Sequence, residues 1–256
     1  SAQPRDVINN LGVYVQQQGT TCGFSGPAAW VVLTPIEQSI KRKIESVGKP
    51  LSDWDISINY GIKTGYNDAF IITTERRDEI LSNCKSEEER QRTEAIIRPI
   101  LRGRDIKRYP YDWAGLWLIW ITWHFPLHLD SSIQGSSAEA EQAFMDQYPS
   151  VYQHLLLYKP QLSARNKAET GIRYEWYALQ RWGANYSDDF SQPKIVWIEL
   201  TDESKFALST DGLIPLNTVF FMVGKHIKYL LAVINSSLIH WYFQHTLGST
   251  SGVGTN

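Results

Sequence analysis

The sequence predicts an α+β fold, a mixed and largely antiparallel sheet with packed helices. Apolar residues alternate over short segments, as in half-buried strands, and other segments carry a helical period behind capping residues. Strand-like and helix-like segments follow no strict alternation, so a doubly wound parallel sheet is not favoured. With 256 residues, of which 43% are hydrophobic and 20% charged, the chain can bury a core in one large domain or two small ones.

The first part of the chain contains one clear helix signal and three short strand signals, the first of them at residues 30–33. Thr34-Pro35 predicts a helix start, because threonine caps a first turn and proline fits its first position. Gly48 marks the end of that helix. The alternation at residues 56–58 predicts a half-buried strand, and residues 69–73 predict another.

The middle of the chain predicts a second capped helix and a central strand. Ser86, followed by three glutamates, is a capping box for a helix that must end near Pro99. The apolar run at residues 116–123 is typical of a central strand. The polar, small-residue stretch 131–138 predicts an internal linker, and two helical stretches follow within residues 138–157.

The last part of the chain predicts strands and one closing helix. Residues 194–200 are expected to form a strand, and residues 206–223 a hairpin that turns at 210–212. An amphipathic helix is expected over residues 227–246.

The composition of the chain restricts its possible location in the cell and the ligands it can bind alone. The longest apolar run, residues 116–123, is too short to span a bilayer, and the polar N-terminal residues show no signal peptide. Cys22 and Cys84 have no metal-spaced partners, which fits a reduced cytoplasmic location. The net charge of −2 argues against a free-standing nucleic-acid binder. A local basic face would nevertheless suffice for a domain that gains affinity from a linked neighbour.

Two basic segments stand out. Residues 98–108 hold five cations and one anion, and residues 159–181 hold five cations and two anions. The first segment is preceded by a glycine-rich block at residues 61–70, and aromatic residues lie among the charges. This mixture suits a loop surface that lies against a polyanion with accessible bases.

The order of these blocks resembles a known family. G-I-x-T-G-x-N-x-A-F, a helix, and then I-x-P-x-L-R-G-R-D-I-x-R-Y are similar to the TaqI-like specificity domain. That domain is the target-recognition half of adenine DNA methyltransferases and of type IIG restriction-modification enzymes. Later landmarks follow in the family's order: Trp176–Leu179, Pro193–Trp197, Phe206-Ala207, Leu216–Thr218 and Tyr229–Leu238. The resemblance covers about residues 30–249.

The resemblance implies a target-recognition-domain-like fold and a sequence-specific, non-catalytic DNA-binding role in a bacterial, cytoplasmic protein. The partners it implies are double-stranded DNA and a covalently linked methyltransferase domain, N-terminal in the parent. The sequence contains neither a glycine-rich cofactor loop nor an Asn-Pro-Pro-Tyr or Asp-Pro-Pro-Tyr motif. We therefore expect residues 1–256 to be an excised recognition domain without cofactor or metal. S-adenosylmethionine, and magnesium if the parent also cleaves DNA, would bind elsewhere in that parent.

Eleven residues are predicted to contact DNA: Lys63, Thr64, Arg98, Arg102, Arg104, Lys107, Arg108, Arg165, Lys167, Arg173 and Arg181. A guanidinium can bind phosphate or guanine through two parallel hydrogen bonds, and Arg104 is our favoured base-reading residue. Purely structural roles remain open, because Asp105 can hold Arg102 or Arg104 as an internal ion pair, and the glycines can serve a tight turn.

Three aromatic residues beside these cations have two interpretations. Tyr174, Trp176 and Tyr177 are candidates for base contact, and the core is their alternative location.

Two other functions compete with DNA recognition. The same fold could serve as a protein-docking or scaffold module. A magnesium-dependent nuclease is the weaker alternative, because Glu203 and Lys205 have the Glu-x-Lys spacing of such enzymes, with Asp188 and Asp189 upstream. The histidine spacings do not predict a zinc site.

Overall fold

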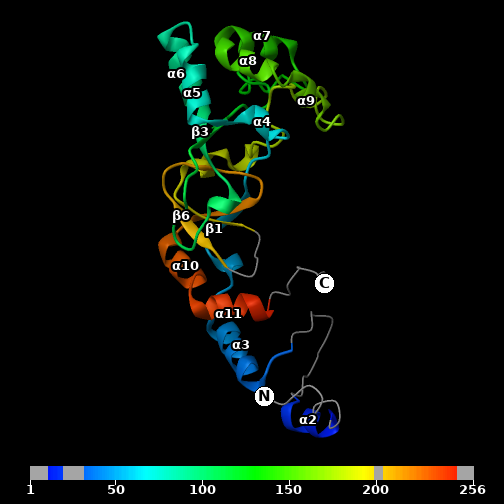
Figure 1. The fold of residues 1–256 in the computed structure, drawn as a ribbon, viewed down its shortest axis with the longest axis vertical. Coiled ribbons are helices and arrows are strands. Elements are labelled where there is room, and N and C mark those ends of the chain that lie inside the picture. Colours follow the sequence, from blue (N-terminus) through cyan, green and yellow to red (C-terminus); the bar gives the residue numbers. More distant parts are fainter. Residues whose placement is uncertain (1–10, 20–31, 199–203, 247–256) are drawn as a thin grey trace. The chain divides into compact units, whose positions relative to one another are not determined.

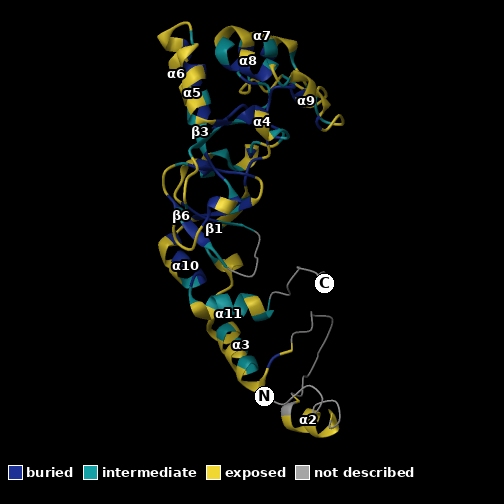
Figure 2. Cartoon of the chain, in the orientation of Figure 1, coloured by how far each residue is buried: buried dark blue, intermediate teal, exposed yellow. Residues whose placement is uncertain are grey.

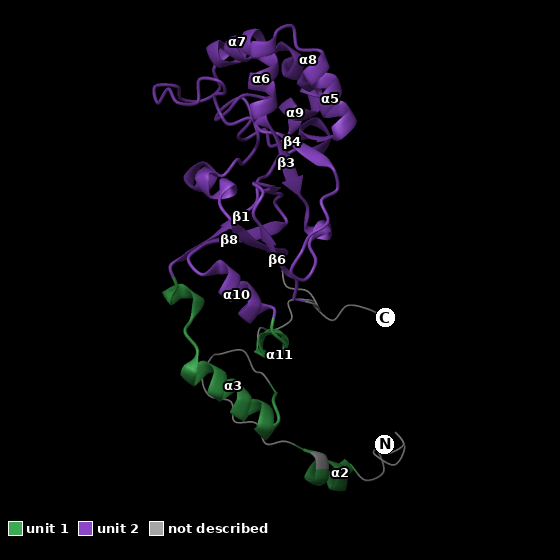
Figure 3. Ribbon diagram, turned by 90° about the vertical axis from the view of Figure 1, so that its left-hand side faces the viewer, with its two compact units in different colours: residues 1–54, 236–256 green, residues 55–235 purple. Residues whose placement is uncertain are grey.

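The computed structural model describes residues 11–19, 32–198 and 204–246 (Figure 1). The chain divides into two compact units (Figure 3): unit 1 comprises residues 1–54 and 236–256, and unit 2 comprises residues 55–235. Of the buried hydrophobic side chains in the described ranges, all but Leu33 belong to unit 2. The predicted α+β class is confirmed, and the polar stretch 131–138 lies inside unit 2.

The first sheet of unit 2 is wholly antiparallel. In spatial order its strands are β1 (Ile56–Tyr60), β8 (Val219–Gly224), β5 (Lys194–Ile198) and β6 (Phe206–Ser209). The register places Trp197 of β5 opposite Phe220 of β8 and Phe206 of β6.

The second sheet is mixed, because β3 pairs antiparallel with β4 and parallel with β7. In spatial order its strands are β2 (Ile71–Thr73), β4 (Leu116–Ile119), β3 (Ile97–Leu101) and β7 (Ile214–Pro215). The rest of the predicted 116–123 strand leaves the sheet, although Trp120 and Ile121 remain buried.

Helices cover both ends of unit 2. They are α4 (Asn67–Phe70), α5 (Thr74–Ser82), α6 (Glu87–Ile96), α7 (Ala138–Gln147), α8 (Pro149–Leu156), α9 (Lys159–Ala164) and α10 (Ile227–Ile234). Helices α5 to α9 gather at the end that holds β3 and β4, and α10 packs against β6 at the other end (Figure 1). Two short 3-10 turns, Gly103–Asp105 and Ala184–Ser191, complete the described elements of this unit. Figure 2 shows the buried residues concentrated in the interior of unit 2.

The predicted helix start at Ser86 is confirmed. The Ser86 side chain accepts a hydrogen bond from the Glu89 backbone N–H at 3.2 Å, which satisfies a free amide of the first turn. Helix α6 ends at Ile96 and passes directly into β3. Pro99 then lies in β3, where it faces Trp117 of β4.

Unit 1 is helical where it is described. Its elements are α2 (Leu11–Gln18), α3 (Pro35–Val47), a 3-10 turn (Leu51–Asp53) and α11 (Ser237–Thr246). The predicted cap of α3 is confirmed, because Thr34 N–H donates to Glu37 Oε2 at 2.7 Å and Glu37 N–H donates to Thr34 Oγ1 at 3.4 Å. Tyr242 of α11 donates to Glu45 of α3 at 3.0 Å. No side chain of α3 is buried.

The predicted closing helix over residues 227–246 is wrong in one respect, because it is two helices interrupted at Asn235. The Asn235 side chain binds the β6 backbone, donating to Phe206 O at 2.9 Å and accepting from Phe206 N–H at 3.3 Å. Ser236 then accepts from the Ile239 backbone N–H at 3.3 Å, at the start of α11. The helical spacing predicts that Leu230, Ile234 and Leu238 pack together; this is confirmed for Leu230 and Ile234, which are buried, and wrong for Leu238, which is exposed.

The predicted hairpin over residues 206–223 is also wrong. Strand β5 lies between β6 and β8 and pairs with both of them. The intervening segment, β7, joins the other sheet through β3. Among the described helices, none has the length and apolarity needed to cross a bilayer.

Candidate nucleic-acid interface

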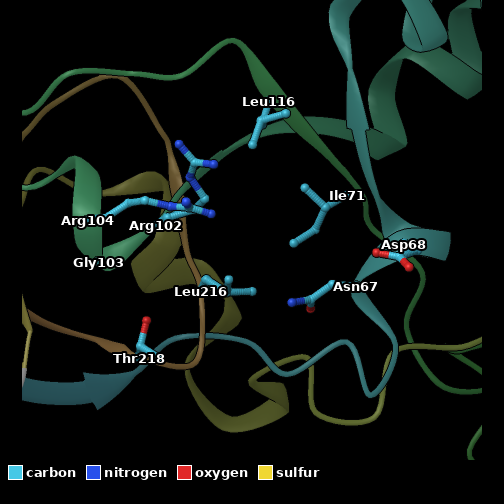
Figure 4. A pocket seen from close by; sticks show the side chains of 9 residues that line it. All are labelled: Asn67, Asp68, Ile71, Arg102, Gly103, Arg104, Leu116, Leu216 and Thr218. Carbon is cyan, nitrogen blue, oxygen red and sulfur yellow. The ribbon is translucent and has the colours of Figure 1, made fainter.

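A cavity of about 450 Å³ lies where the two sequence blocks meet (Figure 4). Asn67 and Asp68 from the first block line it together with Arg102, Gly103 and Arg104 from the second. The other lining side chains are three apolar groups and one hydroxyl, from Ile71, Leu116, Leu216 and Thr218. Segments more than 100 residues apart in the sequence therefore form one concave site.

Main-chain hydrogen bonds hold these segments together. Gly61 N–H donates to Val219 O at 2.8 Å, and Leu216 N–H donates to Leu101 O at 2.9 Å. A Cβ on Gly61 would lie 2.1 Å from Leu216 O, so only glycine allows this close approach. The structural role considered for the glycines of the first block therefore holds for Gly61.

Asn67 has a fixed side-chain amide. Thr64 Oγ1–H donates to Asn67 Oδ1 at 2.6 Å, which engages the carbonyl end of the amide. The Asn67 nitrogen is directed into the cavity (Figure 4). Thr64 itself is buried, with 3% of its surface exposed, so the predicted DNA contact of its side chain is corrected to a positioning role.

The two arginines of the cavity differ in their freedom. Arg102 forms a bidentate pair with Asp105, with both N–O distances at 2.8 Å, and these bonds raise the pKa of Arg102. Asp105 therefore pairs with Arg102 and forms no ion pair with Arg104. The Arg104 side chain is exposed and has no ion pair or hydrogen bond within the described ranges.

Lys63 and Arg181 bring two of the predicted segments together. They form an isolated antiparallel bridge, with N–H to O distances of 2.8 and 2.9 Å between their backbones. Directly opposed residues in such a pair project their side chains to the same face. Both side chains are exposed, and neither has an ion pair among the described residues. The bridge therefore presents two adjacent cations to solvent.

Arg165 lies in the interior, which corrects its prediction as a DNA contact. Its guanidinium donates to the backbone carbonyls of Thr64 and Ala178, and to Trp176 O at 2.9 Å. Burial lowers the pKa of Arg165 to about 10. Thr64 follows Lys63 directly and Ala178 lies three residues before Arg181, so Arg165 binds the backbone next to both strands of the Lys63–Arg181 bridge.

Three cations of the 98–108 segment have internal contacts. Arg98 is half-buried, with its guanidinium 5.6 Å from the centre of the Trp120 ring. Arg108 donates to the backbone carbonyl of Asn235 and lies 5.5 Å from the ring centre of Tyr109. Lys107 lies 4.0 Å from Asp112, and because both side chains are exposed this pair is weak.

Lys167 and Arg173 lie on the loop that follows α9. Both are exposed, and the structure shows no ion pair for either side chain within its described ranges. Their contact with DNA stays a prediction.

The three aromatic candidates for base contact are core residues. Tyr174 stacks on Trp123 with ring centres 4.9 Å apart, and the Tyr177 hydroxyl donates to Phe125 O at 2.8 Å. Trp176 Nε1–H donates to Glu141 Oε1 at 2.7 Å. All three are at least nine-tenths buried, so the core interpretation is correct.

The nuclease alternative gains no support from the described part of the chain. Within it, no group of three His, Cys, Asp or Glu side chains is arranged to bind a metal ion. Glu203 lies outside the described residues. Asp189 accepts hydrogen bonds from Asn59 at 2.8 Å and from Gln192 at 3.1 Å.

The chain is similar to several known proteins. The model of the TaqI-like C-terminal specificity domain matches residues 98–253. The type II methyltransferase M.MjaIV of Methanocaldococcus jannaschii is 20% identical over 201 residues, which cover 76% of this chain and 59% of that protein. The chain thus spans less than two thirds of this relative. A solved structure of the type IIL restriction-modification enzyme MmeI in complex with DNA aligns with a TM-score of 0.44 and 14% identity, over 74% of this chain and 22% of that chain. The family model matches more than half of the residues of this chain. The chain therefore belongs to the TaqI-like C-terminal specificity domain family.

Proposed function

We propose that this chain recognises a specific site in double-stranded DNA for an adenine DNA methyltransferase of the type IIG arrangement, in which methylation and cleavage share one polypeptide. Membership of a specificity-domain family supports the recognition role. The structural observation that carries the proposal is the bridge that presents Lys63 and Arg181 side by side. Two adjacent cations on a rigid backbone suit the phosphates of a duplex.

The proposed DNA surface consists of those predicted contacts that are exposed cations without a strong internal partner. They are Lys63, Arg104, Lys107, Lys167, Arg173 and Arg181. Arg98, Arg102 and Arg108 would support this surface through the contacts that they make inside the domain. Since the net charge of the chain is −2, these cations would act as a local basic face, and a linked domain would supply the rest of the affinity.

The catalytic steps would take place outside this chain. A linked methyltransferase domain would bind S-adenosylmethionine and transfer its methyl group to the adenine amine after the base is flipped. A linked nuclease, if the parent cleaves DNA, would require magnesium. The protein would act in the cytoplasm. This chain would bind neither S-adenosylmethionine nor magnesium.

Salt-dependent DNA binding tests the recognition role. The double variant Lys63→Ala, Arg181→Ala should lower the slope of log affinity against log salt by about two units for duplexes of any sequence. The matched control is Arg90→Ala, Lys228→Ala, which removes one exposed arginine and one exposed lysine on α6 and α10. Equal slopes for the two double variants would contradict the proposed surface.

Two further measurements test the finer parts of the proposal. Selection from a randomised duplex library should yield one preferred site, and the parent protein should convert adenine in that site to a methylated base detectable by mass spectrometry. Methylcytosine in its place would contradict the adenine assignment. Cleavage of the same site in the presence of magnesium would support the type IIG arrangement.

Protein docking is the second candidate, and one observation favours it. Helix α3 exposes apolar side chains, with Ile36 at 75% and Val47 at 69% exposure. Apolar groups in such positions often mark a contact with another protein. DNA binding with a low salt slope, together with retained binding to the methyltransferase domain, would favour this function.

A further inference from the structure

We infer that the cavity between the two sequence blocks binds one sugar–phosphate unit of the DNA backbone. Arg104 and Thr218 on one side of the cavity and Asn67 on the other would donate to the phosphate oxygens (Figure 4). The inference rests on the proposed function, because it assigns a ligand to part of the proposed DNA surface. It also changes the expected role of Arg104 from reading a base to holding the backbone.

The polar groups of the cavity are mainly donors. The Asn67 carbonyl oxygen already accepts a hydrogen bond from Thr64 at 2.6 Å, so the amide nitrogen is the group it offers to a ligand. Arg104 contributes a guanidinium with no partner in the part of the chain that the structure describes. Thr218 contributes an exposed hydroxyl, and these three groups match a ligand that only accepts hydrogen bonds, as phosphate oxygens do.

The carboxylates near the cavity leave its arginine side open to an anion. Asp105 is 7% exposed, and both of its oxygens bind Arg102. Asp68 lies across the cavity from Arg104 (Figure 4). An anion beside Arg104 would therefore lie on the side of the cavity away from its free carboxylate.

The apolar part of the lining explains why the ligand is larger than a free anion. Ile71, Leu116 and Leu216 line the cavity with side chains that form no hydrogen bonds. The cavity volume of about 450 Å³ lies within the range of roughly 300–1,000 Å³ found for sites that bind organic ligands. A deoxyribose next to the bound phosphate would pack its C–H groups against these apolar side chains.

The concave shape favours the backbone over a base. In a duplex, base edges lie on the floor of the grooves, and protruding helices, strands or side chains reach them. The sugar–phosphate strands are the ridges of the duplex, and a ridge fits a concave site. An asparagine that reads adenine also uses its carbonyl oxygen as an acceptor, and here Thr64 engages that oxygen.

A methylphosphonate scan combined with substitution tests the inference. Each phosphate of a bound duplex is replaced in turn by an uncharged methylphosphonate, and affinity is measured with the full chain in its parent protein. One phosphate position should lower wild-type affinity by about tenfold, as expected for losing a hydrogen bond to a charged group. In Arg104→Ala the penalty at the same position should fall to a few-fold, because only Asn67 and Thr218 remain to donate to that phosphate.

Controls separate this result from general loss of charge or folding. Arg90→Ala removes an exposed arginine on α6 and should keep the full penalty at that position. Asn67→Asp should weaken binding to the unmodified duplex more than Asn67→Ala, because it adds a negative charge beside the phosphate. Thermal unfolding of each variant should match wild type within a few degrees.

Two failures have different meanings. Salt-dependent DNA binding with no phosphate position whose penalty depends on Arg104 would overturn the inference and leave the proposed function intact. Absence of DNA binding by the wild-type protein would overturn the proposed function, and the inference with it.

Discussion

The two basic segments hold the same number of cations and use them differently. Between residues 98 and 108, Arg98, Arg102 and Arg108 contact an aromatic ring, a carboxylate or a backbone carbonyl inside unit 2. Between residues 159 and 181, Arg165 is buried, and Lys159 lies 3.4 Å from Glu141 and 4.7 Å from the ring centre of Trp176. The other three cations of this second segment, Lys167, Arg173 and Arg181, are exposed.

The difference shows that the density of charge in a sequence does not measure its availability to a ligand. The more compact segment leaves Arg104 and Lys107 without a strong internal partner, whereas the more dispersed one leaves Lys167, Arg173 and Arg181 in that state. A guanidinium inside a domain satisfies backbone carbonyls, and one on an exposed loop can meet a phosphate. The following predictions test this division between internal and available cations.

The largest effect should come from Arg165→Met. This change removes a partner of three backbone carbonyls at residues 64, 176 and 178. Thr64 O still accepts from Gln180 N–H at 3.4 Å, so two carbonyls lose their partner. The free energy of unfolding should fall by about 2 kcal/mol or more, because each buried acceptor left unsatisfied costs about 1–3 kcal/mol. Urea denaturation measures it, with the exposed Arg173→Met as the control, expected within about 0.5 kcal/mol of wild type. Equal stability of the two variants would contradict the distinction between internal and available cations.

Arg102→Met should destabilise the domain less. It leaves the Asp105 side chain, which is 8% exposed, without its bidentate partner. A loss of about 1–3 kcal/mol is expected from the unsatisfied carboxylate. Adding Asp105→Leu should recover part of that loss, because an apolar side chain needs no counter-charge. A double-mutant cycle in urea would show the pair to be unimportant if the two changes were simply additive.

DNA binding should respond to the available cations of the second segment. The triple variant Lys167→Ala, Arg173→Ala, Arg181→Ala should lower the salt slope by about three units if each side chain contacts a phosphate. Arg98→Met with Arg108→Met should lower it by less than about one unit, because both guanidiniums have internal contacts. Fluorescence anisotropy over a salt series gives both slopes, and the reverse order would contradict the division.

The smallest effect concerns Lys194, a buried cation of β5 that donates to Phe190 O at 2.8 Å. Burial lowers its pKa from 10.5 to about 8 in the folded state. Between these two values the unfolded chain keeps a proton that the folded chain has lost, so stability rises with pH. Below about pH 8 the contribution is constant and at its lowest. The unfolding free energy of wild type minus that of Lys194→Met should therefore increase from pH 8 to pH 10, and a flat difference would mean that this lysine is not desolvated.

The sequence predicted those features whose causes are local. Caps at Thr34 and Ser86 depend on residues three positions away, and both are present. The break at Asn235 could not be predicted, because the Asn235 side chain binds Phe206, 29 residues away in the sequence. The buried position of Arg165 could not be predicted either, because its hydrogen-bond partner Thr64 is 101 residues away in the sequence.

The candidate site shows the same limit. Residues of the two sequence blocks were predicted to contact DNA, and the structure places both blocks around one cavity. Thr218 was not among the predicted contacts, because a single threonine at the end of a landmark carries no charge signal. Asn67 lay within the motif, and its fixed amide became apparent only from the hydrogen bond with Thr64.

Strand β1 has a consequence for exchanging this domain between enzymes. The family match begins at residue 98, whereas β1 pairs along its length with β8, and unit 2 begins at Asp55. A transplanted segment that started at residue 98 would leave the β8 backbone unpaired at a new sheet edge, and such edges recruit strands from neighbouring molecules and aggregate. It would also lose Lys63, whose backbone pairs with Arg181. A soluble chimera therefore requires a junction before residue 55.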